Sequence, residues 1–367
     1  LLVLLEPEAI VKGSVYMRWA KDHAAARYNL ANSGLLGCST EDLPFSPGDL
    51  LVNGPNRDGY PPLLEAIAAK YGVSPDRVVT APGASGANFL AFAALVDAGD
   101  EVLVERPTYE PMLAALNFLG ARVRRFERRF EDGWQVDADG IRRHLATGRV
   151  RLVVLANPHN PSGVLVPPDE IGEIARLAAY AGATLVVDEV YRDIWFEDAP
   201  PSHVHLGQNV VATSSLTKSY GLSGLRCGWI LAPPDLAGRM RKVKDLMQAV
   251  DSVPSESLSV AAFRNLPRFE ARSRAILTPN LAQIRAFLAN HAEWLDCVVP
   301  ERAMCVFPRL KKEEDSEPLH DWLRGRETSI VPGKFFEDRR FFRLGFAVKP
   351  EDVAAGLRNL SEGLRRG

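Results

Sequence analysis

Short apolar runs alternate with longer amphipathic runs between about residues 78 and 232 of the chain. The short runs, such as VRLVVLANP and ATLVVDEVY, are rich in β-branched residues, which favour buried strands. The long runs, such as NFLAFAALVDAG and PDEIGEIARLAAYAG, have a helical pattern and are followed by Gly99 and Gly182. This alternation predicts an α/β fold with a mostly parallel central sheet flanked by helices.

The pattern changes toward both ends of the chain. Before residue 50 and after about residue 255, long helical runs dominate, and strand-like runs such as AMCVFPRL and FFRLGFA are few. A chain of 367 residues exceeds the usual limit of a single hydrophobic core. We therefore predict a large domain over residues 50–260 and a smaller α+β domain built from both termini. Residues 1–49 form its N-terminal segment, and residues 261–367 form its C-terminal part.

The composition narrows the class of ligand. A formal net charge of −2 gives no electrostatic reason to expect nucleic acid or an anionic membrane surface as a partner. The four cysteines form no C-x-x-C pair and have no accompanying histidine cluster, so neither a disulfide framework nor a metal site is expected. A reducing cytoplasm and small polar ligands fit these features.

Ligands of such folds bind where the strands end, and two predicted strand ends carry unusual residues. In TAPGASGAN, the small residues from Gly83 to Gly86 allow backbone N–H groups to close on an anion, although tight packing explains them as well. In ERPTYEP, two prolines fix the chain around Tyr109, which suits an aromatic ring lying flat on a ligand or a tyrosine at the edge of the core.

Two further strand ends carry polar groups. In LANPHNPSG, Asn160 or Asn157 can point an amide at a ligand oxygen, and turn formation is the alternative. In ATLVVDEVY, Asp188 follows a strongly apolar run, where a carboxylate needs a positive partner unless it caps the next helix. Tyr191 lies three residues on and reaches the same space.

The stretch TSSLTKSYGLSGLRCGW explains what these loops share. A buried lysine amine such as that of Lys218 is readily deprotonated and then attacks carbonyl carbon. Arg226 and Ser215 are suited to hold a phosphate beside it. A phosphate site, a carbonyl-seeking lysine, a stacking tyrosine and a carboxylate awaiting a cationic ring nitrogen together describe pyridoxal 5′-phosphate (PLP).

The order and spacing of these motifs resemble the class I/II aminotransferases of the fold-type I PLP family. The shared motifs are a Gly-rich turn, P-x-Y, N-P-x-N-P-[ST]-G, D-E-x-Y and S-x-[ST]-K-x-x-G-L-x-G-x-R. The resemblance covers essentially the whole chain, from GYPPLLEAIAAKYG to FFRLGFA. It implies that residues 50–260 are the PLP-binding domain.

The resemblance also implies roles for the residues at the cofactor. Lys218 forms the aldimine with PLP and later moves the α-proton of the substrate. Asp188 pairs with the ring nitrogen, Tyr191 and Asn160 donate to the ring's 3′-oxygen, and Tyr109 stacks on the ring. The phosphate is held by the backbone of Ala84 and Ser85 and by Ser215, Arg226 and Thr217.

For the substrate, the resemblance implies that Arg343 in FFRLGFA matches the arginine that binds the α-carboxylate, and that Asn160 is a further substrate contact. The segment YNLANSG resembles the one that folds over the substrate, with Asn32 and Gly34 as its contacts. One departure stands out. Where the family has Y-x-x-x-x-G-x-P-x-L-R, this chain reads NGPNRDGYPPLLEAI, so that Asn53 or Gly54 replaces the tyrosine that reaches the partner subunit's phosphate. Leu64 replaces the arginine, and Asn53, Asn56 or Tyr60 are the possible substitutes for the tyrosine.

The implied reaction is transamination between an amino acid and a 2-oxo acid in a cytoplasmic homodimer. The alternatives are another PLP reaction on an amino acid, β-elimination or decarboxylation, or the effector-binding part of a transcription regulator with this fold. The sequence shows no basic helix-turn-helix of the kind that such a regulator needs.

Overall fold

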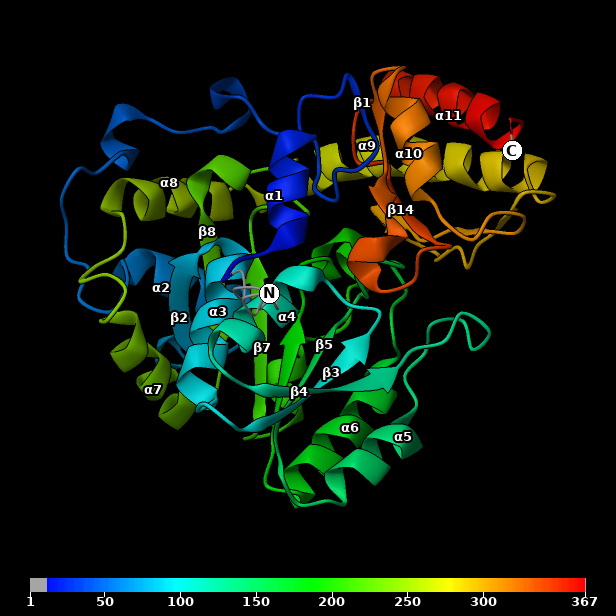
Figure 1. Cartoon of the computed structure of the whole chain (residues 1–367). Helices are drawn as coiled ribbons and strands as arrows, with labels where there is room; N and C mark the ends of the chain where they lie inside the picture. The colour runs from blue at the N-terminus through cyan, green and yellow to red at the C-terminus, as the bar shows by residue number, and fades with distance from the viewer. Residues whose placement is uncertain (1–11, 367) are drawn as a thin grey trace, which may run out of the picture.

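The computed structural model describes residues 12–366, and its centre is a seven-stranded sheet (Figure 1). The strands lie in the order β2-β8-β7-β6-β5-β3-β4. β8 runs antiparallel to both of its neighbours, whereas the other paired strands of this sheet are parallel. The prediction of a mostly parallel sheet is therefore confirmed. The strands are β2 (Val78–Pro82), β3 (Glu101–Arg106), β4 (Arg122–Glu127), β5 (Val150–Ala156), β6 (Thr184–Asp188), β7 (Val210–Ser215) and β8 (Cys227–Leu231).

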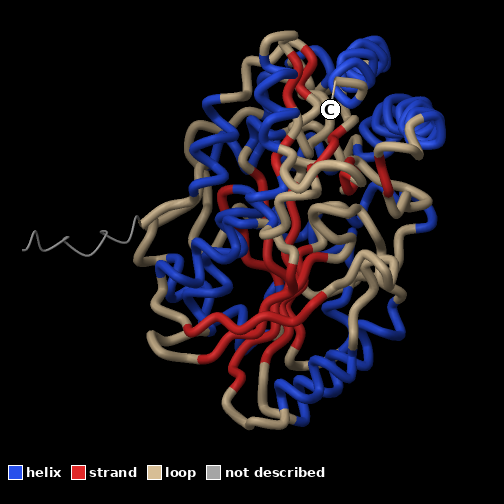
Figure 2. Tube along the Cα trace, turned by 45° about the vertical axis from the view of Figure 1, so that its right-hand side comes forward, coloured by secondary structure: helices blue, strands red, loops and turns tan. Residues whose placement is uncertain are grey.

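Helices cover both faces of this sheet (Figure 2). Along β3, Val102 and Val104 pack in the cluster that contains α3 and α4, whereas Leu103 packs in the cluster that contains α5 and α6. Because both faces are buried, the strands read as continuous apolar runs. The helices of this part are α2 (Pro61–Tyr71), α3 (Gly83–Leu95), α4 (Glu110–Phe118), α5 (Ala138–Leu145), α6 (Pro168–Tyr180), α7 (Pro234–Lys244) and α8 (Val253–Phe263).

The second part of the molecule contains helices and short strands from both ends of the chain. Its helices are α1 (Val15–Asp22), α9 (Leu266–Asn290), α10 (Glu317–Arg324) and α11 (Pro350–Leu364). Its strands are β1 (Tyr28–Asn29), β9 (Leu295–Asp296), β10 (Cys305–Val306), β11 (Arg309–Leu310), β12 (Thr328–Ser329), β13 (Val331–Pro332) and β14 (Phe342–Gly345). Short 3₁₀ helices connect the elements of both parts: η1 (Thr40–Asp42), η2 (Pro47–Asp49), η3 (Pro75–Arg77), η4 (Arg192–Asp198), η5 (His203–Leu206), η6 (Ser223–Leu225) and η7 (Gly333–Phe336).

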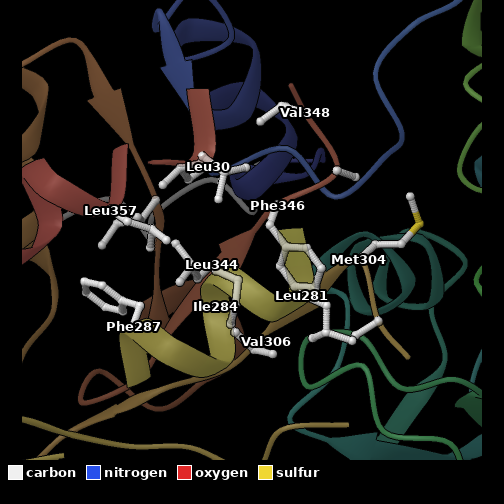
Figure 3. Close-up of a cluster of buried hydrophobic side chains, with 14 of the residues drawn as sticks. Leu30, Leu281, Ile284, Phe287, Met304, Val306, Leu344, Phe346, Val348 and Leu357 are labelled. Atoms are coloured by element: carbon white, nitrogen blue, oxygen red, sulfur yellow. The ribbon is translucent and has the colours of Figure 1, made fainter. Parts of the chain in front are cut away.

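The two ends of the chain interlock in this second part. β1 pairs with β12 in parallel, and the backbone N–H of Gly345 donates to the carbonyl oxygen of Leu30 at 2.7 Å. Leu30 is fully buried with Ile284, Leu344 and Phe346 (Figure 3). The predicted α+β part formed by both termini is thus confirmed. The boundaries at 1–49, 50–260 and 261–367 stay a prediction, and residues 1–11 lie outside the described residues.

Two kinds of feature are absent from the described residues. Within residues 12–366, no helix is both long and apolar enough to span a bilayer. The same residues contain no group of three or more histidine, cysteine, aspartate or glutamate side chains arranged to hold a metal ion.

Gly345 tests the junction between the two ends. A β-carbon added there would collide with the carbonyl oxygen of Asn32, so Gly345→Ala must push residues 30–32 off β14. We expect a loss of stability of about 1–3 kcal/mol, as for other overpacked sites, measured as a lower midpoint in thermal or urea unfolding. Gly37→Ala is the matched control, because a β-carbon at Gly37 meets nothing within 4 Å. Equal midpoints for the two variants would contradict the interlocked packing.

Candidate active site

The predicted loops converge at one edge of the large sheet. β2, β3, β5, β6 and β7 are parallel to one another, so their carboxyl ends lie at the same edge. Tyr109, Asn160, Asp188 and Lys218 all follow or end these strands. Arg226 precedes β8, which runs in the opposite direction and so begins at that edge. The edge therefore collects side chains from segments more than one hundred residues apart in sequence.

Asp188 is a buried carboxyl at the end of β6. Its two oxygens accept hydrogen bonds from Asn88 Nδ2 at 2.9 Å and from the backbone N–H of Val190 at 3.0 Å. Asn88 is itself oriented by Thr213, whose hydroxyl donates to Asn88 Oδ1 at 2.5 Å. Burial raises the pKa of Asp188 to about 6, although the two hydrogen bonds and the charge of Lys218 oppose this rise. The site thus stabilises Asp188 best when a cation lies beside it.

Lys218 lies under the N-terminal segment. Its Nζ donates to Ser33 Oγ at 3.1 Å, and its backbone carbonyl accepts from the N–H of Leu35 at 2.9 Å. A β-carbon at Gly34 would lie 3.4 Å from Lys218 Cδ, so the segment packs closely against the lysine. Burial lowers the pKa of Lys218 to about 8, and the positive charge of Arg343 lowers it further, against the opposing effects of Cys305 and Asp188. About one tenth of this amine is therefore unprotonated at pH 7 and available as a base or nucleophile.

Two tyrosines border the same space. Tyr191 is buried, burial raises its pKa, and its hydroxyl has no hydrogen-bond partner within residues 12–366. Tyr109 is partly buried, and its hydroxyl contacts Met17 Sδ at 3.3 Å while its ring meets Tyr16 edge to face at 5.6 Å. Burial raises the pKa of Tyr109 as well. An orphaned hydroxyl such as that of Tyr191 is costly unless a ligand accepts or donates to it.

The N-terminus of α3 forms a corner suited to an anion. No side chain caps this end, so the backbone N–H groups of Ala84 and Ser85 remain as donors at the positive end of the helix. Gly83 has φ +76°, and a β-carbon there would collide with the guanidinium of Arg226. Arg226 itself is exposed and donates to the carbonyl oxygen of Pro82 at 3.0 Å.

Two hydroxyl residues, Ser215 and Thr217, lie just before Lys218 in the sequence. Ser215 ends β7 and is buried, and its Oγ accepts from the backbone N–H of Thr217 at 3.3 Å. Thr217 is partly exposed. These two hydroxyl residues therefore lie between the strand end and the lysine.

Arg343 reaches the site from β14 and is fully buried. Its Nη1 donates to Asn160 Oδ1 at 3.0 Å, and its Nη2 donates to the hydroxyl of Tyr16 at 2.6 Å and to the carbonyl oxygen of Ala31 at 3.0 Å. No acidic side chain is among these partners. Asn157, the alternative to Asn160, instead bonds the backbone of Val166 through both ends of its amide.

The N-terminal segment contributes one residue that the sequence indicated, Asn32, and two that it did not, Tyr16 and Ser33. Asn32 is bonded to the backbone of Gly34 in both directions, so it shapes the loop that covers Lys218. Ser33, Tyr16 and Asn88 contact Lys218, Arg343 and Asp188 respectively, and none was singled out from the sequence. Ser33 lies inside the quoted YNLANSG motif, which is a signal that could have indicated it, whereas the sequence carries no comparable signal for Asn88.

The segment that departs from the family motif is held by the carboxylate of Glu256. Glu256 Oε2 accepts from Asn56 Nδ2 at 2.8 Å and from the N–H of Tyr60 at 2.9 Å. Asn53 is exposed, whereas Asn56 is buried in these contacts. Asn56 is thus hydrogen-bonded within this chain, and of the three possible substitutes Asn53 has the most solvent-accessible side chain.

A family model described as aminotransferase class I and II matches residues 47–360. The chain belongs to this family. It is 33% identical to a capreomycidine synthase of Streptomyces vinaceus over 312 residues, which cover 82% of this chain and 78% of that protein. Its structure is similar to that of a PLP-dependent aminotransferase from Streptococcus suis, with a TM-score of 0.88, 27% identity and coverage of 95% and 96%. It is also similar to a PLP-dependent cyclase, OrfR, with a TM-score of 0.86, 27% identity and full coverage of both chains.

PLP is the cofactor of this aminotransferase-family chain, and the described residues fit it. The Tyr191 hydroxyl, which has no partner within residues 12–366, suits the ring oxygen of PLP. The uncapped N-terminus of α3 suits the phosphate, and the buried Asp188, which has no cationic hydrogen-bond partner, suits the ring nitrogen. Lys218, whose pKa is lowered by burial, suits the aldehyde, with which an unprotonated amine reacts. The individual roles of these residues stay predictions.

The raised pKa of Asp188 predicts a pH-dependent stability in the cofactor-free protein. Since the folded-state pKa of about 6 exceeds the unfolded-state value, unfolded Asp188 ionises first, and the parent loses stability as the pH rises from about 4 to above 6. Asp188→Asn removes this loss. The stability of the variant minus that of the parent should therefore rise by about 3 kcal/mol between pH 4 and pH 7, measured by urea unfolding. A difference that does not vary with pH would show that Asp188 is not desolvated.

Proposed function

We propose that this chain is an aminotransferase that moves an amino group between an L-amino acid and a 2-oxo acid. The main support for this proposal is the environment of Arg343. Its guanidinium is fully buried, and its hydrogen bonds go to neutral oxygens of Asn160, Tyr16 and Ala31. A buried cation without a counter-charge is costly, and an α-carboxylate supplies that charge. Both substrates of a transamination carry a carboxylate at this position.

The other residues support this chemistry. Bound PLP supplies the electron-withdrawing ring that allows the α-carbon of an amino acid to lose its proton. Lys218 would accept that proton at Nζ and return it, because a pKa of about 8 leaves part of the amine unprotonated near neutral pH. Asp188 would hold the proton on the ring nitrogen. Asn160 binds Arg343 through Oδ1, which leaves its Nδ2 to donate toward the ring oxygen beside Tyr191.

A homodimer is part of this proposal. Two segments adjoin here, because Asn56 Nδ2 donates to the carbonyl oxygen of Asp251 at 3.0 Å, and both segments carry exposed apolar side chains. Apolar surface of this kind is typical of protein interfaces. The exposed residues, from 47% to 85% accessible, are Val52, Leu246, Met247 and Val250. We predict that a second copy of the chain covers them.

A cyclisation of an amino acid is the second candidate. The observation that favours it is the similarity to a capreomycidine synthase at 33% identity and to a PLP-dependent cyclase over the full length of both chains. Loss of the α-proton is common to many PLP reactions, and the surroundings of the cofactor determine the next step of the reaction. The residues around Lys218 and Arg343 suit either outcome, so the fate of the amino nitrogen decides between them.

Nitrogen transfer tests the proposal directly. We would incubate the PLP-loaded protein with ¹⁵N-labelled amino acids and with pyruvate, oxaloacetate or 2-oxoglutarate, and follow ¹⁵N by mass spectrometry. Transamination predicts that ¹⁵N appears in the amino acid derived from the acceptor, and that Lys218→Ala abolishes the transfer. If the label instead stays in a cyclised product or is released as ammonia, the chain is not an aminotransferase.

A further inference from the structure

The hydrogen bonds of Arg343 leave it no complete fork for a carboxylate. A guanidinium binds a carboxylate through two parallel N–H groups, either Nη1 with Nη2 or Nε with Nη2. Nη2 belongs to both forks. In this structure Nη2 donates one hydrogen to the Tyr16 hydroxyl at 2.6 Å and the other to the carbonyl oxygen of Ala31 at 3.0 Å. Nε has no partner within residues 12–366, but alone it offers a single hydrogen bond.

One of the two acceptors on Nη2 is fixed and the other is not. The carbonyl of Ala31 follows Leu30, whose own carbonyl is bonded to the N–H of Gly345 at 2.7 Å on the strand that carries Arg343. Ala31 therefore moves only if the junction between the two ends of the chain opens. The Tyr16 hydroxyl is at the tip of a side chain and comes from a separate helix, α1.

Tyr16 is the buried attachment of α1, and Met17 and Trp19 add partly exposed contacts. Among the eight residues of this helix, Tyr16 is the one that is buried, and Val15 before it is 63% exposed. The ring of Tyr16 packs edge to face on Phe335 and on Tyr109, each at 5.6 Å. Trp19 adds a partly exposed contact with Phe335 at 5.1 Å. A helix of this length is marginal by itself, so removing the Tyr16 anchor favours its release.

We propose that Tyr16 occupies the carboxylate site of Arg343, and that a substrate carboxylate binds by displacing the Tyr16 hydroxyl and releasing α1. This inference rests on the proposed function, which assigns the carboxylate to Arg343. The exchange replaces a neutral acceptor by a charged one in a buried site, which drives it toward the substrate. The apparent affinity for amino acids equals the intrinsic affinity multiplied by the fraction of the protein in which the Tyr16 hydroxyl is not bonded to Nη2 of Arg343. An amine without a carboxylate has no means of displacing Tyr16.

Binding of 2-methylalanine measures this competition, because this amino acid has a carboxylate but no α-hydrogen to lose. We would titrate it into the PLP-loaded parent and into Tyr16→Phe, and follow the visible absorption of the bound cofactor. Tyr16→Phe keeps the ring and loses the competing hydroxyl. A hydrogen bond to a charged group is sufficient for about a tenfold change, so the dissociation constant should fall about tenfold. Lys21→Ala, an exposed change on the same helix, should leave it unchanged.

Hydrogen exchange supplies a readout that does not depend on the cofactor spectrum. Addition of 2-methylalanine to the parent should speed amide exchange in residues 15–22. Tyr16→Ala, which removes the ring contacts with Phe335 and Tyr109, should show fast exchange there without ligand. Weaker binding of 2-methylalanine by Tyr16→Phe would overturn the proposal, since Tyr16 would then be a substrate ligand. Unchanged exchange in α1 would overturn the release of the helix.

Arg343→Lys separates this inference from the proposed function. Lysine keeps the charge but lacks the fork, so 2-methylalanine should bind at least tenfold more weakly to this variant. If Arg343→Lys binds 2-methylalanine as the parent does, the carboxylate is bound elsewhere, and the proposed role of Arg343 is wrong whatever Tyr16→Phe does. If Arg343→Lys loses affinity while Tyr16→Phe gains none, only the competition by Tyr16 is wrong.

Discussion

The carboxyl group of Asp188 is buried at the end of β6, where its hydrogen-bond partners are the neutral donors Asn88 and Val190. Desolvation of an acid in such a place is tolerable if a cation lies beside it, and the ring nitrogen of PLP is such a cation. The parallel strands on both sides of β6 bring Asn160 and Lys218 to the same edge. We therefore propose that the burial of Asp188 fixes where the ring nitrogen of PLP binds, and that Lys218 meets the cofactor from the adjacent strand end.

The second constraint comes from residues 31–34 of the N-terminal segment. Ser33 and Gly34 pack on Lys218, and the carbonyl of Ala31 holds Arg343. This segment is fixed by the backbone bond between Leu30 and Gly345, so the lysine of the large sheet and the arginine of the C-terminal part are positioned by one structural element. Interlocking of the two ends of the chain is thus a condition for the site as well as for the small α+β part.

The sequence predicted the parts of this structure that have a local pattern. Alternating apolar runs predicted the parallel sheet, and the strand-end motifs predicted Asp188, Lys218 and their neighbours in the site. The reversal of β8 has no such pattern, because its run GWILAPP reads like that of a parallel strand. Asn88 and Tyr16 were missed because each is one polar group on a helix, and only tertiary packing places it on Asp188 or Arg343. The short strands of the second part are two to four residues long, below the length at which periodicity is informative.

Covalent capture of the cofactor tests the central claim, which is that Lys218 is the amine that meets PLP. The PLP-loaded protein would be reduced with sodium borohydride, digested and mapped by mass spectrometry. The account predicts that the phosphopyridoxyl group is found on Lys218, whose amine has a pKa lowered to about 8 by burial. Recovery of the group on another lysine, such as the buried Lys244 or the half-buried Lys70, with Lys218 unmodified, would contradict it.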